Sequence, residues 1–177
     1  MTDLHVRKRH RLRQKEIQTL SGEIESVLGA RAFTVDDTVD MAEAPDYDVV
    51  FVNGKILAFR PGGQSFLTVR GLLKYGATKR YVTVDMGAVK FVYNGADVMA
   101  PGIVGLDEGI AEGDLVWVRD VKNLRPLAVG RAVMSAKKMA LKEKGKAVVS
   151  VHHVGDKLWL ADEPKDKPAA AKPGDGS

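Results

Sequence analysis

Residues 88–103, with the sequence AVKFVYNGADVMAPGI, constrain the fold of this chain more than any other stretch. The run is mostly apolar, yet glycine or proline interrupts it at Gly95, Pro101 and Gly102. Because glycine and proline break long helices and strands, the run predicts short buried elements joined by tight corners. We expect a helix that Gly87 opens and Gly95 ends, and then a type II turn in which Gly102 takes a positive φ.

Short β-like runs surround this stretch. They are YVTV, LVWVRDV, LAVGRAVM, AVVSVHHV and LWLA, in chain order from Tyr81. One helix interrupts them, with Ser135 as its N-cap, the helix formers AKKMALKEK as its body and Gly145 at its end. Several short strands at close spacing predict a small barrel.

The first 78 residues have a different pattern. Ile17, Leu20, Ile24 and Val27 recur at helical spacing, and Gly29 offers a stop. Asn53-Gly54 between two apolar runs predicts a hairpin, because both residues accept positive φ. Thr68 is suited to cap a short helix that Gly76 closes, whereas the basic run near the N-terminus fits either an extension of the first helix or a short strand.

These patterns together predict the α+β class. We expect a small α/β domain with a basic N-terminus over residues 1–78, a β-barrel domain over 79–161, and a disordered tail rich in Pro, Ala, Lys and Gly over 162–177.

Charge is unevenly distributed along the chain. Residues 1–15 hold six basic side chains against one acidic, and residues 80–160 hold twelve against nine, whereas residues 16–79 hold six basic against nine acidic. Positive charge at both ends of the folded region suggests a polyanionic partner, most often nucleic acid. A solvated face that aids solubility is an equally good interpretation of charge alone.

Several classes of function lack support in the sequence. There is no cysteine, no apolar run near the roughly 20 residues that span a bilayer, and no Gly-rich phosphate loop. The chain starts with charged residues, so we expect no signal peptide and a cytoplasmic location. His152, His153 and Asp156 suggest a metal cluster, but neighbouring residues on a strand point to opposite faces, so a core or surface role is favoured. We therefore predict no enzyme, no cofactor and no metal.

The barrel region resembles a known family. VDMGAVKFVYNGADVMAPGIV, followed by GDLVWV, AVGRAVMSAKKM and GKAVVSVHHVGDKLW, is similar to the PUA domain, the RNA-binding module of pseudouridine synthases and archaeosine transglycosylases. The resemblance covers roughly residues 79–160 and implies a six-stranded pseudo-barrel with flanking helices. It also implies that the glycine-rich helix–strand junction contributes to an RNA-binding surface.

The upstream half, VNGKILAFRPGGQSFLTVRGLLKYG, resembles the pre-PUA domain of the malignant T-cell amplified sequence translation factors and their archaeal relatives. Those proteins are non-enzymatic, and the eukaryotic members act at the small ribosomal subunit with a partner protein. The resemblance thus implies a protein that binds tRNA or rRNA, in contact with the small ribosomal subunit and a translation-factor partner. A protein–protein adaptor and an accessory subunit of an RNA-modifying enzyme are the alternatives.

We predict that three groups of residues contact RNA. The first group is the glycine-rich junction, the second is a set of lysines on the later helix, and the third is the basic N-terminus. A spacing of four residues places Lys138 and Lys142 on one face of that helix. The candidates are Gly95, Ala96, Met99, Pro101 and Gly102; Lys137, Lys138 and Lys142; and Arg7, Lys8, Arg9, Arg11 and Arg13. Tyr81 and Tyr93 are the aromatic residues near the glycines, and a core role is favoured for both.

Overall fold

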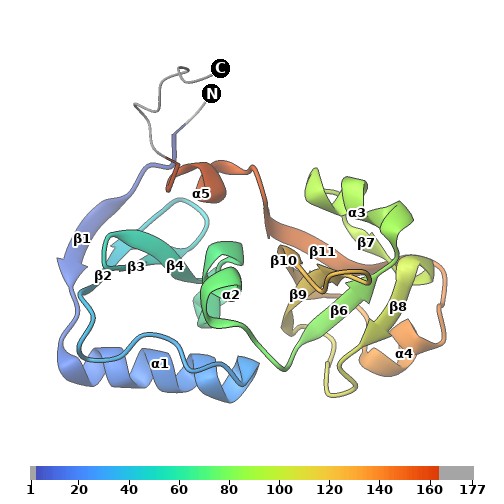
Figure 1. Ribbon diagram of the computed structural model, residues 1–177, viewed down its shortest axis with the longest axis horizontal. Helices are drawn as coiled ribbons and strands as arrows, with labels where there is room; N and C mark the ends of the chain where they lie inside the picture. Colours follow the sequence, from blue (N-terminus) through green and yellow to red (C-terminus); the bar gives the residue numbers. More distant parts are fainter. Residues whose placement is uncertain (1–2, 164–177) are drawn as a thin grey trace.

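The computed structural model describes residues 3–163 and consists of two units that lie side by side along the long axis of the molecule (Figure 1). The first is a five-stranded antiparallel sheet with helices, and the second is a six-stranded, nearly closed barrel. The α+β class predicted from the sequence is confirmed. No helix in the described range is long and apolar enough to cross a membrane.

The first unit has the sheet order β1-β2-β3-β4-β5. Its elements are β1 (Arg7–Arg11), α1 (Gln14–Leu28), β2 (Val39–Glu43), β3 (Asp48–Val52), β4 (Lys55–Arg60), a 3-10 turn η1 (Pro61–Gly63), β5 (Phe66–Leu67) and α2 (Val69–Tyr75).

Local sequence signals account for most of this unit. Helix α1 buries one apolar face, and Gly29, at a φ of 68°, ends it as predicted. The predicted hairpin joins β3 to β4, with Asn53 and Gly54 both at positive φ. The hydroxyl of Thr68 accepts the Gly71 N–H at 3.1 Å and caps α2, as the sequence predicted. Of the two alternatives for the basic run, the structure shows the strand, β1.

The second unit has the sheet order β7-β11-β10-β9-β6-β8. Its elements are β6 (Tyr81–Val84), α3 (Met86–Tyr93), β7 (Val98–Met99), a 3-10 turn η2 (Ala100–Gly102), β8 (Ile103–Leu106), β9 (Leu115–Asp120), β10 (Pro126–Ala132), α4 (Ala136–Ala140), β11 (Lys146–His153) and α5 (Lys157–Leu160).

Strand β9 is buried on both of its faces. Val116 and Val118 point into the barrel core, whereas Leu115 and Trp117 alternate with them and pack against the core of the first unit. The unbroken apolar run LVWV therefore reflects a strand that serves two cores. The two units share a hydrophobic contact rather than a flexible hinge.

Two predicted elements differ from the sequence interpretation. LWLA is not a strand but the helix α5, because Asp156 caps it by accepting the Trp159 N–H at 2.9 Å and Leu158 packs onto the first unit. Helix α4 ends at Ala140 rather than near Gly145, since the chain leaves helical geometry and Lys142 has a φ of 54°.

The corner at Pro101-Gly102 also differs from the prediction. It is the 3-10 turn η2 rather than a type II turn, and Gly102 does not have a positive φ. Pro101 sits in the first turn of this short helix, where its missing N–H costs nothing.

The predicted boundary near residue 78 falls in the connection between α2 and β6 and stays a prediction. The first residues of the predicted tail make contacts: Asp162 accepts the Ile56 N–H at 2.8 Å, and Glu163 lies 3.2 Å from Arg70. The rest of that tail, residues 164–177, lies outside the described residues.

Candidate nucleic-acid interface

A groove runs between helix α3 and the β7–η2 segment at the barrel end of the molecule. Its volume is ≈ 390 Å³, and its walls include Ala88, Phe91, Met99 and Gly102. The start of α3 is fixed to η2, because the Asp85 N–H donates to the Gly102 carbonyl at 3.0 Å and the Asp85 carboxylate caps the helix at Ala88 N. The glycine-rich stretch thus forms both walls of one groove.

Large apolar side chains stand in solvent along this groove. Phe91 is 58% exposed and Met99 is 48% exposed. Exposed apolar side chains that adjoin a hollow mark binding surfaces more often than scattered ones do. Met99 was predicted to contact RNA, whereas Phe91 was not. The usable signal was that MGAVKFVY is apolar except for Lys90, although only Val92 of this helix is buried.

An ion pair closes one side of the groove. Lys146 Nζ lies 3.0 Å from the Asp97 carboxylate, which also accepts the Ser150 N–H at 2.8 Å. The Ser150 N–H and then Lys146 hold the pKa of Asp97 below its usual value. Since Lys146 is more than half exposed, its ammonium remains within reach of a ligand in the groove.

Four of the five predicted junction residues border open space, Met99 among them. Ala96 and Pro101 are exposed. Gly102 is half-buried, and a Cβ there would lie 3.6 Å from the Ala88 Cβ, an ordinary contact. Neither space nor φ requires glycine at position 102, so its missing side chain serves to widen the groove.

Gly95 differs from Gly102. Its φ is 95°, and a Cβ there would lie 2.8 Å from Nε2 of His153. The imidazole of His153 therefore occupies the side of Gly95 that was expected to lie open to RNA. Sequence analysis could not bring these two residues together, because they lie on different elements far apart in the chain.

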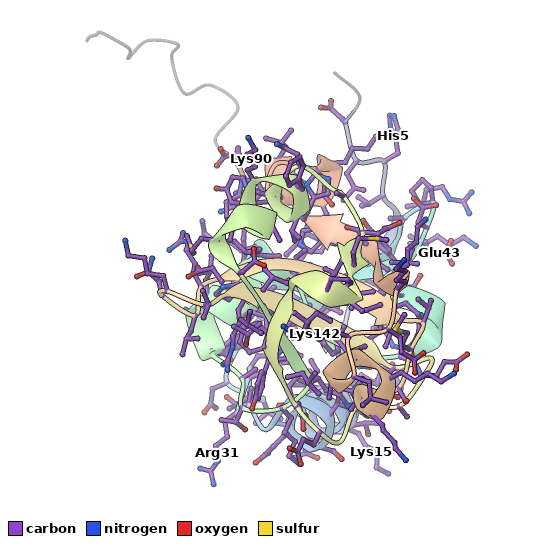
Figure 2. The ribbon with its side chains drawn as sticks, turned by 90° about the vertical axis from the view of Figure 1, so that its right-hand side faces the viewer. His5, Lys15, Arg31, Glu43, Lys90 and Lys142 are labelled. Carbon is purple, nitrogen blue, oxygen red and sulfur yellow. The ribbon has the colours of Figure 1, made fainter. Side chains whose placement is uncertain are left out.

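The predicted lysines lie on the same unit but not in the predicted arrangement. Lys137 and Lys138 are exposed on α4. Lys142 follows the helix, so it does not share a helical face with Lys138 as the spacing suggested. Figure 2 looks at the barrel end of the molecule, where Lys142 lies near the middle of the face and Lys90 at its upper edge.

Three of the predicted arginines, Arg7, Arg9 and Arg11, lie at the opposite end, on β1 (Figure 1), and Arg13 is the N-cap residue of α1. Arg9 and Arg11 both bind the Asp40 carboxylate, and Arg7 lies 3.1 Å from Glu43. The guanidinium of Arg9 also covers the Phe51 ring at 3.7 Å.

Other cations of this segment are less engaged. Lys8 and Arg13 are exposed and form no ion pair with a carboxylate within residues 3–163. The candidate residues therefore form two separate groups, one at each end of the molecule, rather than one continuous surface.

The buried ring of His152 connects the two units. Its Nε2 accepts the Val69 N–H at 3.1 Å, so the proton is on Nδ1, which donates to the Asp156 carboxylate at 2.9 Å. Burial raises the pKa of Asp156, but hydrogen bonds from His152 and from the Trp159 and His153 backbone outweigh it and leave the pKa below the usual value. The described part of the chain holds no cluster of three potential metal ligands.

Tyr81 packs as expected. Its ring lies edge-on to Trp117 at 6.5 Å between centroids, and the Arg119 guanidinium covers it at 3.8 Å. Tyr93, in contrast, is 43% exposed.

Comparison with known proteins adds to this geometry. A family model described as the PUA domain matches residues 80–154. An uncharacterised protein of Methanocaldococcus jannaschii is 39% identical over 162 residues, which is 88% of this chain and 98% of that protein. The crystal structure of a hypothetical protein from Pyrococcus horikoshii OT3 has a TM-score of 0.75 and 38% identity, covering 86% of this chain and 98% of that one.

Two eukaryotic proteins match over a shorter region. Translation machinery-associated protein 20 of Eremothecium gossypii is 33% identical over 114 residues, 61% of this chain and 63% of that protein. Malignant T-cell-amplified sequence 1-B of Xenopus laevis is 35% identical over 117 residues, 63% of this chain and 64% of that protein. The match covers less than two thirds of each eukaryotic protein.

Proposed function

Since this chain belongs to the family of PUA-domain proteins that includes the translation machinery-associated 20 and malignant T-cell-amplified sequence proteins, we propose that it binds structured RNA without catalysing a reaction. The family membership and fold inferred from the sequence are thereby confirmed. The RNA is tRNA or rRNA, and the protein acts in translation in the cytoplasm, at the small ribosomal subunit and with a translation-factor partner.

The observation that carries this proposal is the groove with Phe91 and Met99 exposed on its walls. Unpaired bases stack on exposed apolar and aromatic side chains, and RNA-binding proteins usually recognise loops and ends in this way. A side-chain-free Gly102 lets the strand approach the backbone closely.

The surrounding cations supply the second component of binding. Lys90, Lys146 and the lysines of the α4 region lie on the same barrel as the groove. Phosphates that contact them release counterions, so affinity depends on salt. The similarity to translation machinery-associated protein 20 supports the translation context.

Binding of tRNA and of a small-subunit rRNA fragment, measured by fluorescence anisotropy at a series of salt concentrations, tests the proposal. We expect binding at low salt that weakens steeply as salt rises, with a slope equivalent to several phosphates. Undetectable binding of both RNAs at low salt would refute it.

A protein–protein adaptor remains the second candidate. Its support is a groove of ≈ 350 Å³ beside α1, whose lining combines Leu20 and Met41 with the charged residues Lys15, Glu16, Glu23 and Arg60. Complexes that survive nuclease treatment would favour this function, and complexes that nuclease dissolves would favour RNA.

A further inference from the structure

His153 lies where the end of β11 meets the end of helix α3, next to the groove. Its Nδ1 lies 3.1 Å from the Tyr93 carbonyl and 2.8 Å from the Val154 carbonyl. Ala96, which lines the groove, follows directly after Gly95, the residue that faces the imidazole. The ring therefore lies against Gly95, one residue before a residue that lines the proposed RNA site.

These contacts determine which ring nitrogen carries the proton. Carbonyl oxygens only accept hydrogen bonds, so Nδ1 of His153 must be the donor to Tyr93 and Val154. In the neutral imidazole, Nε2 is then an acceptor with a free lone pair. The contact with Tyr93 also gives the ring a structural role, since a histidine near the C-terminus of a helix often binds the last carbonyl groups of that helix.

That structural role leaves Nε2 unused. Within residues 3–163, Ser150 Oγ is the one buried side-chain nitrogen or oxygen that lacks a hydrogen-bond partner. Nε2 of His153 makes no hydrogen bond either, so it must reach solvent. A side chain on Gly95 would come within 2.8 Å of Nε2 and would cover it, and glycine at this position keeps the acceptor free.

We propose that Nε2 of His153 accepts a hydrogen bond from a ribose 2′-hydroxyl of the bound strand and thereby selects RNA over DNA, an inference that rests on the proposed function. Phosphate oxygens and the ring oxygen of the sugar only accept hydrogen bonds. The 2′-hydroxyl is the donor that a ribose-phosphate backbone offers within a strand, and DNA lacks it. An acceptor at the edge of the groove matches that group and no other part of the backbone.

The test compares one single-stranded sequence as RNA, as DNA and as 2′-O-methyl RNA, at pH 8, where free imidazole is neutral. The wild-type protein should bind the RNA about three- to ten-fold more tightly than either analogue, the usual worth of one hydrogen bond. This measurement needs no variant.

Two substitutions separate the nitrogen atoms. His153→Asn keeps a donor for the Tyr93 carbonyl but has no acceptor at the Nε2 position, so RNA binding should weaken about three- to ten-fold with DNA binding unchanged. His153→Gln keeps an acceptor near that position and should retain most of the preference. His10→Asn is the matched control, because its Nδ1 also binds a carbonyl, that of Lys8, at 3.1 Å, on β1.

Equal affinity of the wild-type protein for RNA, DNA and 2′-O-methyl RNA would overturn the inference and leave RNA binding intact. An unchanged preference in His153→Asn would also overturn it. If the wild-type protein binds none of the three strands but does bind tRNA or the rRNA fragment at low salt, the inference about His153 alone is overturned. If it binds none of these nucleic acids, the proposed function fails as well, so the two failures can be told apart.

Discussion

The β1 end and the groove end of the molecule both carry several cations, but those cations have different neighbours. On β1, three of the arginines are bound to Asp40 or Glu43 on the adjacent strand. On the barrel, Lys137 and Lys138 of α4 form no ion pair with a carboxylate in the described range, whereas Lys146 at the groove pairs with Asp97 at 3.0 Å. A basic run in a sequence therefore shows how many positive charges are present, but not which of them are free to bind a ligand.

Substitution of His152, which links the two units, should have the largest effect of all, and the effect should be on stability. His152→Ala removes a fully buried ring and leaves the Val69 N–H and the Asp156 carboxylate without their partner. We expect the free energy of unfolding to fall by about 3 kcal/mol, from the lost packing and the unpaired groups. Urea denaturation measures this. His10→Ala on exposed β1 is the control, and an equal loss in both variants would contradict the role of His152.

Truncating the exposed side chains of the groove should have the second-largest effect, on RNA affinity. Phe91→Ala combined with Met99→Ala should weaken RNA binding at least ten-fold, since stacking contributes about 1–3 kcal/mol per base. Leu73→Ala, at a side chain 39% exposed on α2 of the first unit, should leave binding unchanged. If Leu73→Ala weakens binding as much as the double variant, the groove is not the site.

Neutralising Asp40, which pairs with two arginines of β1, should have a smaller effect, and it should raise RNA affinity instead of lowering it. Asp40→Asn releases Arg9 and Arg11, so we expect a loss of about 1 kcal/mol in stability and a gain in nonspecific RNA affinity. Hydrogen bonding from Arg11, and then from Arg9, lowers the pKa of Asp40. Asp46→Asn, at an exposed position, is the control.

The pH dependence of Asp40 has a defined sign. Because its folded pKa lies below the ordinary value of 3.8, its stabilising contribution is present above that pH and is lost as the pH falls through the lowered folded value. Acid unfolding of Asp40→Asn should thus show a weaker decline in stability below pH 3.8 than the wild-type protein. An identical decline would mean that Asp40 is not coupled to folding.

The smallest effect concerns single phosphate contacts. Lys137→Ala and Lys138→Ala should each reduce the salt slope of RNA binding by about one. Arg7→Ala should leave the slope unchanged, because Arg7 lies on β1 at the opposite end of the molecule from the groove. A larger change for Arg7 than for the lysines would place the phosphate contacts at β1.

Sequence analysis succeeded where structure depends on neighbouring residues. The cap at Thr68, the turn at Asn53-Gly54 and the stop at Gly29 all follow from local backbone chemistry. The small barrel followed from the close spacing of short apolar runs, and the family followed from the resemblance of the glycine-rich stretch and the segments after it to the PUA domain.

It failed where distant segments meet. LWLA is a short apolar run like the strands before it, but Leu158 packs on the first unit and the segment is a helix. The contact of His153 with Gly95 and the pairing of Arg11 with Asp40 each join elements that sequence spacing does not relate. Which side chains contact one another in this way depends on tertiary structure. The list of candidate residues therefore included some side chains that are free to bind RNA and others that already contact another part of the protein.

The two-sided burial of β9 has a consequence for modularity. A barrel excised at residue 79 would expose a plate formed by Leu115, Trp117, Val129 and Leu158, which now rests on the first unit. Such a plate favours self-association, so transplanting this barrel onto another protein would require polar replacements at these positions or a substitute cover. In this chain each unit therefore covers an apolar surface of the other.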